Sequence, residues 1–289
     1  MSVRRDSLLS VMAAVLVLAG VLVLCYPWAA SWVSQYNQSA VVAGGVPAGR
    51  SDAAANAKAL ALAREYNSRL TSDALYKANS NVPRSSQGEG LHTLYEQALD
   101  AGRGLMARIQ MPSISLDLPI YHGTSDETLL RGVGHLEGTS LPVGGKGTHA
   151  VLTGHRGLAQ ATMFTNLDKV NKGDLFTVST FGQALTYRVT DIKVVDPDQT
   201  QSLRAVEGKD LVTLVTCTPL GINTQRIFVT GERVTPTPPQ SVAAASDTPD
   251  VPGTPWWLFI LIAVILLDLI WLYRTLHPSI SGRHIHMHR

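Results

Sequence analysis

The residues best suited to carry chemistry in this 289-residue chain are Cys217, Arg226 and His155. Cys217 ends the strand-like run LVTLVTC, and Arg226 opens the next such run after a turn containing Pro and Gly. If the two runs pair as antiparallel strands, opposed residues bring their Cβ atoms to about 4.5 to 5.5 Å. A guanidinium beside a cysteine favours the thiolate and offers donors to a developing oxyanion. The spacing therefore predicts a nucleophilic cysteine with an arginine partner.

A nucleophile of this kind needs an acid/base, and His155 is the best placed histidine. It follows the strand-like run HAVLT and stands between Gly154 and Arg156, where a strand is expected to end. An imidazole can give and take a proton near neutral pH because its ordinary pKa is about 6.5. The competing histidines are expected to be packed or surface residues: His122, His135 and His149.

The alternative for Cys217 is a place in the core, since free cysteines are among the most often buried residues. The other cysteine, Cys25, lies inside an apolar run, so no disulfide between the two is expected. A lone thiol in a domain outside the cell then needs another reason, and catalysis is one. Thr216, directly before the cysteine, is a candidate for oxyanion support, with a plain strand position as its alternative.

Strand-like runs fill residues 105–234 around these side chains. Short β-branched runs separated by Gly, Pro and Asp favour an antiparallel barrel or sandwich over alternating β-α units. The prediction is a mainly β domain with short helices. The expected strands are 106–111, 115–121, 149–153, 175–180, 185–195, 211–216 and 227–230, and the expected short helices are 128–132 and 162–170.

A helical region is expected ahead of the β domain, in residues 51–104. Apolar residues recur at helical spacing from 51 to 78, and a second, shorter helix is expected at 91–99. The segment between them is rich in Asn, Ser, Gly and Pro, which predicts an exposed loop that is either a lid or a connection. After the β domain, the Pro-rich segment 235–255 predicts an extended spacer.

Two apolar runs, 7–25 and 256–273, are each long enough to cross a bilayer. The first run also fits a cleavable signal peptide because small residues follow it, but we favour an uncleaved anchor with a linker at 26–50. The second run has Trp or Tyr at both rims, which suits a spanning helix. Its one carboxylate, Asp268, lies near enough to the end to reach polar head groups.

Positive charges set the expected orientation in the plasma membrane. Arginines occur in the tip at 1–6 and in the tail at 274–289, so both ends are expected in the cytoplasm and the β domain outside the cell. For the tail histidines His284, His286 and His288, a short polar tail is favoured over metal binding. A net charge of +2 with scattered Lys and Arg argues against nucleic-acid binding.

The run TLVTC at 213–217 resembles the TLxTC active-site motif of sortases, with Arg226 at the family's arginine position and TGHRG at 153–157 around its histidine. The similarity continues through MPSISLDLPIYHGTS and GVGHLEGTSLPVGGKGTHAVLTGHRG. The span from Leu105 to Arg233 resembles class C, the pilus-building sortases of Gram-positive bacteria. The resemblance implies a closed sortase-type β-barrel, here with a helical region before it and a transmembrane helix on either side.

The resemblance also implies an activity. A sortase cuts an LPxTG-like sorting signal after its threonine and holds the acyl group as a thioester, here on Cys217. In class C a pilin lysine amine then resolves the thioester, so the implied partners are pilins or surface proteins that carry such signals. On this reading His155 protonates the leaving amine and later accepts a proton from the attacking amine, while Arg226 steadies the substrate backbone and oxyanion. No metal or organic cofactor is implied.

The chain departs from class C at the lid. Class C enzymes usually carry an Asp-Pro-aromatic motif over the cysteine, whereas the loop here reads ANSNVPRSSQGEG, with Val82, Pro83 and Arg84 at its proline. We expect a variant lid at these three residues, with a plain exposed loop as the alternative.

Three other functions stay open. A housekeeping sortase would attach proteins to cell-wall peptide, although the C-terminal apolar run argues against it. A cysteine protease would release the acyl group to water, but a papain-like enzyme has its cysteine before its histidine, and here His155 comes first. A non-enzymatic β-rich ectodomain would hold Cys217 and His155 as core residues.

Overall fold

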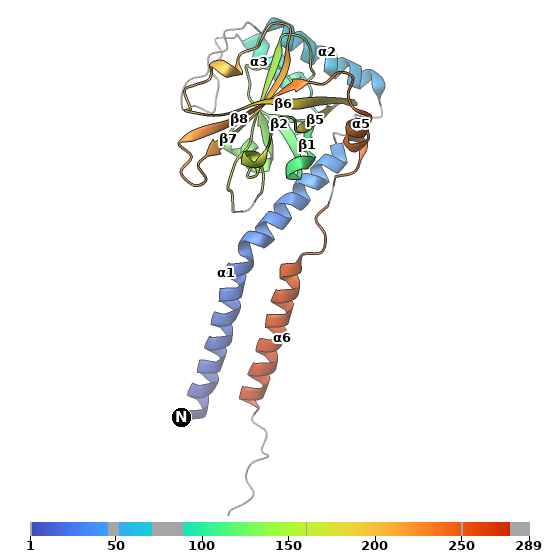
Figure 1. The fold of residues 1–289 in the computed structure, drawn as a ribbon. Coiled ribbons are helices and arrows are strands. Elements are labelled where there is room, and N and C mark those ends of the chain that lie inside the picture. The colour runs from blue at the N-terminus through green and yellow to red at the C-terminus, as the bar shows by residue number, and fades with distance from the viewer. Residues whose placement is uncertain (1, 46–51, 71–88, 160, 250, 278–289) are drawn as a thin grey trace, which may run out of the picture. The chain divides into compact units, whose positions relative to one another are not determined.

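The computed structural model describes residues 2–45, 52–70, 89–159, 161–249 and 251–277 (Figure 1). The chain divides into two compact units, one made of Met1–Val33 with Pro252–Arg289 and the other of Ser34–Val251. The loop with Val82, Pro83 and Arg84 lies outside the described residues, as do His284, His286 and His288. The expectations for the lid and for the tail therefore stay predictions.

Two apolar helices dominate the first unit, α1 (Ser2–Gly45) and α6 (Trp256–Leu276), and both are long and apolar enough to cross a membrane. Helix α1 continues through the segment where we predicted a linker, because residues 28–43 contain no Gly or Pro that would end it. Its last turns belong to the second unit. The Trp28 and Trp256 rings lie 5.3 Å apart, a pairing that suits a membrane interface.

Eight strands form the second unit's closed barrel, in the order β1-β2-β3-β4-β7-β8-β6-β5. The strands are β1 (Leu105–Met111), β2 (Leu116–His122), β3 (Val133–His135), β4 (Thr148–Thr153), β5 (Leu175–Thr180), β6 (Gln183–Val195), β7 (Asp210–Thr218) and β8 (Gln225–Arg233). The predicted barrel is confirmed, but wholly antiparallel pairing is wrong, because β2 pairs with β3 and β4 with β7 in parallel. Parallel pairs join strands separated by long crossovers, so no local turn signal marks them.

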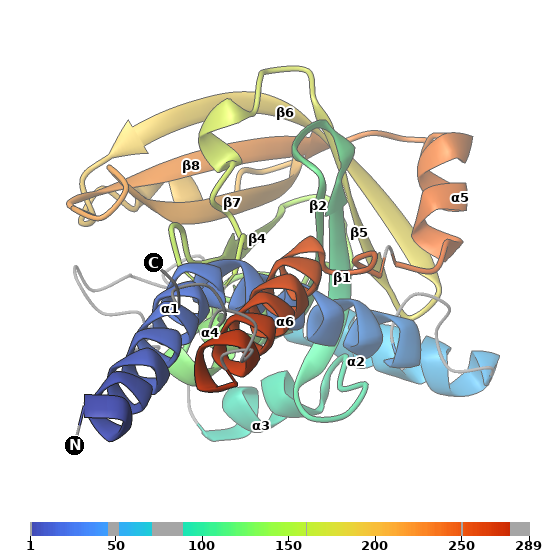
Figure 2. The ribbon, with the colours of Figure 1, turned by 90° about the horizontal axis from the view of Figure 1, so that it is seen from below.

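Helices attach to the barrel at several points. They are α2 (Ala53–Arg69), α3 (Glu89–Gln97), α4 (Asp126–Arg131) and α5 (Pro239–Ser246). Helices α2 and α3 lie on the same side of the barrel (Figure 2), with the Tyr66 and Tyr95 rings 5.5 Å apart. Helix α5 corrects the prediction of a wholly extended spacer, since proline at its first position and an alanine run favour a helix. The helix expected at 162–170 is only a 3-10 turn, Leu167–Lys169.

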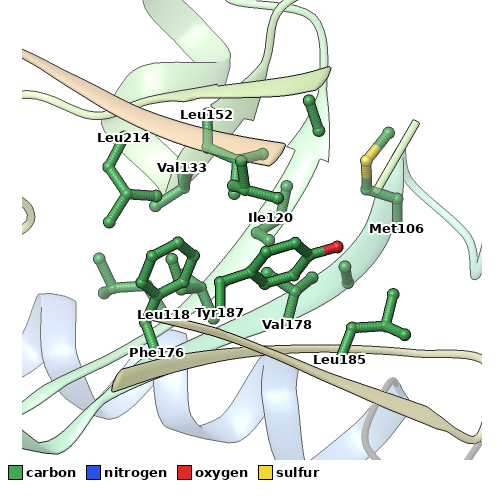
Figure 3. Close-up of a cluster of buried hydrophobic side chains, with 14 of the residues drawn as sticks. Met106, Leu118, Ile120, Val133, Leu152, Phe176, Val178, Leu185, Tyr187 and Leu214 are labelled. Carbon is green, nitrogen blue, oxygen red and sulfur yellow. The ribbon is translucent and has the colours of Figure 1, made fainter. Parts of the chain in front are cut away.

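The barrel interior is apolar and built from side chains of many strands (Figure 3). The Phe176 and Tyr187 rings stack with centroids 5.5 Å apart, and both side chains are fully buried. A Cβ atom at Gly231 would come within 2.5 Å of the Phe176 ring, so this position of β8 needs a glycine. Burying one such side chain stabilises the fold by about 1.5 to 3 kcal/mol. The core therefore fixes the strands that lead to the site.

Residues 234–247, the C-terminal strap, follow β8 back across the barrel. Thr237 Oγ1 donates to the Ala184 carbonyl at 3.0 Å, and Gln110 Nε2 to the Ala244 carbonyl at 3.2 Å. At its end the strap meets Arg108, whose side chain is only 1% exposed. Arg108 donates to the Asp247 carbonyl at 2.8 Å and makes a bidentate ion pair with the Asp117 carboxylate.

We expect Asp117→Asn to lower the free energy of unfolding of the second unit by about 3 kcal/mol, because it leaves a buried guanidinium without its counter-charge. The matched control is Asp191→Asn, which breaks exposed pairs with Lys172 and Lys193 and should cost less than about 1 kcal/mol. Urea unfolding of the detergent-solubilised chain, followed by near-ultraviolet circular dichroism, measures both. Equal effects of the two variants would show that burial of Arg108 adds nothing to the contribution of its ion pair to the free energy of unfolding.

Candidate active site

Strands β7 and β8 place Cys217 and Arg226 directly opposite one another. Cys217 lies one residue before the end of β7, and Arg226 is the second residue of β8. Both residues are partly exposed, so each is accessible from solvent. The predicted register is confirmed, and both cysteines of the chain are free thiols, as expected.

The parallel pairing of β4 with β7 brings His155 to the same edge of the barrel. The last pair of this ladder is Thr153 with Val215, and the Gly154 amide continues it by donating to the Val215 carbonyl at 3.0 Å. His155 therefore lies two residues after Thr153, and Cys217 lies two residues after Val215, the partner of Thr153. Strands that run in the same direction end at the same edge, which explains why residues 62 positions apart meet.

All three predicted catalytic residues line one pocket, which has a volume of about 120 Å³. Cys217, His155 and Arg226 contribute to its polar lining, together with several threonines. The apolar part of the lining, here called the floor, is a small cluster separate from the main core, made of Leu136, Val151, Leu203, Val215 and Phe228. Apolar side chains in the lining offer water no hydrogen-bond partner beside the thiol and the imidazole.

Burial lowers the pKa of His155 below its ordinary value, because a partly desolvated site disfavours the imidazolium. The negative charge of Asp126 acts in the opposite direction and raises the same pKa. Asp126 is the first residue of α4, whose N-cap Ser125 accepts a bond from the Thr128 amide. At neutral pH His155 is therefore mainly neutral and able to accept a proton. The sequence reasoning missed Asp126, since nothing local marks its nearness to His155.

The β7–β8 loop holds the Arg226 guanidinium in place. Its Nη1 donates to the Asn223 carbonyl at 2.9 Å and to the Gln225 carbonyl at 3.0 Å. Asn223 has a φ of 60°, a conformation that asparagine tolerates better than most residues. Among the described residues, none accepts a bond from Nε or Nη2, so these groups keep N–H donors for a substrate oxygen.

Thr216 is almost fully buried, and its hydroxyl donates to the Gly154 carbonyl at 2.7 Å. The single hydroxyl proton thus points to the segment that precedes His155. Oxyanion support by Thr216 would require this bond to break first. Within the described residues, the hydroxyl instead joins the strand of Cys217 to the strand of His155.

The competing histidines are packed, as predicted. His122 has both ring nitrogens on backbone carbonyls, those of Gly104 and Ala98, at 3.0 and 2.8 Å. His149 contacts the Arg204 carbonyl and the Thr213 hydroxyl. Burial lowers the pKa of His135 to about 3, so this imidazole is neutral at pH 7. These three histidines are buried and absent from the lining of the Cys217 pocket.

Comparison with known proteins identifies the family of the barrel domain. A family model described as the sortase domain matches residues 109–234. Among solved structures, sortase C-1 from Actinomyces oris is 52% identical with a TM-score of 0.56, and the match covers 62% of this chain and 98% of that one. Group B Streptococcus Pilus Island 1 sortase C2 is 44% identical with a TM-score of 0.55, over 63% and 99%.

Curated relatives match just under half of this chain. Sortase A of Bacillus anthracis is 32% identical over 130 residues, which are 45% of this chain and 60% of the relative. Sortase D of Bacillus subtilis is 33% identical over 131 residues, 44% of this chain and 63% of the relative. The match thus spans about three fifths of the length of these two proteins. The chain belongs to the sortase family.

We expect Asp126→Asn to move the titration of His155 to lower pH, because it removes the charge that opposes the effect of burial. The rate of modification of His155 by diethyl pyrocarbonate follows the neutral imidazole, and peptide mass spectrometry reads it at this site across a pH series. The wild-type midpoint should lie below about 6.5. Glu127→Gln, the neighbouring exposed position, is the control and should move the midpoint less. A midpoint unchanged or raised in Asp126→Asn would contradict the assignment.

Proposed function

We propose that this chain is a class C sortase, a membrane-anchored cysteine transpeptidase that joins pilin subunits outside the cell. The observation that carries the proposal is the meeting of three groups in one pocket: Cys217 lies opposite Arg226 across β7 and β8, and His155 follows the end of β4, which is parallel to β7. A nucleophile, a proton carrier and a fork of donors are the parts that acyl transfer through a covalent intermediate requires.

The first half-reaction forms a thioester. His155 first takes the proton of the Cys217 thiol. The Cys217 thiolate then attacks the threonine carbonyl of an LPxTG-like sorting signal, and the carbonyl electrons move to oxygen, where Arg226 donates hydrogen bonds. The Thr–Gly bond then breaks, and protonated His155 gives its proton to the departing glycine amine. Covalent catalysis of this kind divides one difficult displacement into two easier steps.

The second half-reaction transfers the acyl group. A lysine amine of the next pilin attacks the thioester carbonyl, neutral His155 accepts a proton from that amine, and the Cys217 thiolate leaves. The product is an isopeptide bond between two subunits, and no cofactor enters the balance. The apolar floor of the pocket favours transfer over hydrolysis, because it limits the approach of water to the thioester.

Class C is supported by the relatives and by the apolar helices before and after the barrel in the chain. Sortase C of Streptococcus pneumoniae, 35% identical, is described in terms of its pilin substrate specificity. The helices α1 and α6 fit two membrane anchors, one before and one after an extracellular barrel in the sequence, with both ends of the chain in the cytoplasm. The expected partners are pilins or surface proteins with sorting signals and the lipid bilayer.

A second candidate function is attachment of proteins to the cell wall. Three curated relatives carry the name sortase A and not sortase C, so the class C interpretation has to be tested against this second function. The two functions share the first half-reaction and differ only in the amine that resolves the thioester. The acceptor therefore distinguishes them.

We expect the whole chain in lipid nanodiscs to form an adduct on Cys217 with an LPxTG peptide, detected by mass spectrometry. Cys217→Ala should form none, because it has no sulfur to acylate. Arg226→Lys should slow adduct formation about 100-fold, since lysine lacks the planar fork of donors. The control Arg188→Lys changes an exposed arginine of β6 and should react normally. Normal adduct formation by Arg226→Lys would remove Arg226 from the mechanism.

Addition of amines to the loaded enzyme then decides the acceptor. A peptide with a pilin lysine should release the acyl group as an isopeptide, whereas a cell-wall stem peptide should not. The reverse preference would favour the cell-wall function. Release to water alone would contradict both.

A further inference from the structure

We infer that Arg156 is a positioning residue that holds His155 beside Cys217. The inference deepens the proposed function and rests on it. Arg156 directly follows His155 in the chain, yet its side chain turns into the protein and is only 9% exposed. A guanidinium removed from water in this way needs hydrogen-bond or ion-pair partners, and these partners show which segments Arg156 holds in place.

The three guanidinium nitrogens of Arg156 bind three residues that lie in two other segments. Nη1 donates to the Thr218 hydroxyl at 3.0 Å, and Thr218 is the residue after Cys217. Nε donates to the Thr165 carbonyl at 3.2 Å. Nη2 makes an ion pair with Asp168 at 2.6 Å, in the 3-10 turn that follows. One side chain thus connects the histidine segment, the nucleophile strand and the 162–169 region.

Backbone bonds hold the same segment from its other sides. The His155 carbonyl accepts from the Phe164 amide at 3.0 Å, and the Gly157 amide donates to the Thr165 hydroxyl at 3.1 Å. Gly157 has a φ of 74°, and a Cβ atom there would come within 2.5 Å of Leu220 in the β7–β8 loop. The segment after His155 is therefore packed directly against the loop that joins Cys217 to Arg226.

Position matters here because His155 has to reach both the sulfur and the leaving amine. The ring is only partly buried, so the backbone on which it stands sets most of its placement. A displacement of about 1 Å in a catalytic group can cost about 100-fold in rate. Lysine at 156 could reach one of the three partners but not all of them, since it presents a single ammonium.

The decisive variants are Arg156→Lys, which keeps the charge, and Thr218→Val, which removes only the tie to the nucleophile strand. In nanodiscs, both should lower the kcat of thioester formation by about 10- to 100-fold with little change in KM. Asp168→Asn removes a partner that is 44% exposed and should have a smaller effect. Arg188→Lys on β6 serves as the matched arginine control.

A second readout separates positioning from simple loss of fold. When the segment loosens, His155 becomes more hydrated, and its titration midpoint should move up toward the ordinary value. Diethyl pyrocarbonate modification measures this shift without any substrate. A purely structural role would reduce the folded fraction and leave the midpoint of the folded protein unchanged.

The outcomes are distinct. A raised midpoint together with a lower kcat supports the inference. Wild-type kcat and midpoint in Arg156→Lys and Thr218→Val would overturn it. If the wild-type chain forms no thioester, the proposed function fails. The midpoint of His155 then still reports whether Arg156 fixes this segment, because that measurement needs no acyl transfer.

Discussion

The parallel ladder between β4 and β7 is the constraint on which the site depends. Six consecutive residue pairs, from Thr148 with Asp210 to Thr153 with Val215, fix how far each strand extends. Since side chains alternate along a strand, a shift of one residue would turn the facing groups away from one another. The alignment of His155 with Cys217 is therefore a property of the whole ladder. The apolar core inside the barrel then prevents the ladder from sliding.

The apolar pocket floor affects several properties at once. Val151, Val215 and Phe228 line the pocket together with Cys217, and burial at this pocket lowers the pKa of His155. A neutral imidazole is the form that can accept a proton from an attacking amine. In the proposed reaction, the surroundings that limit water would therefore also keep His155 in the form that accepts a proton from an amine. The negative charge of Asp126 acts against this effect, because it raises the pKa of His155.

A feature of the site could be predicted from the sequence when the residues that form it lie close together along the chain. Cys217 and Arg226 belong to adjacent strands joined by a short loop, so spacing alone placed them opposite one another. The parallel partner of β7 lies far away in the chain, and β3 is too short to show a period, so neither could be found by local pattern. The role of Arg156 could not be predicted for a similar reason. That role depends on contacts with Thr218 and Asp168, which lie far from Arg156 or outside its local pattern and meet it only in the folded chain.

The C-terminal strap has a mechanical consequence. Tension applied to the chain beyond Asp247 first meets the bonds from Arg108 and Gln110 of β1, before it can reach β8. Those bonds lie on the opposite side of the strand order from β7 and β8, which carry the nucleophile and its arginine. A force on the chain after Asp247 is thus transmitted to β1 of the barrel through these bonds. A load carried through this part of the chain would therefore reach β1 before it could distort the pocket at the ends of β4, β7 and β8.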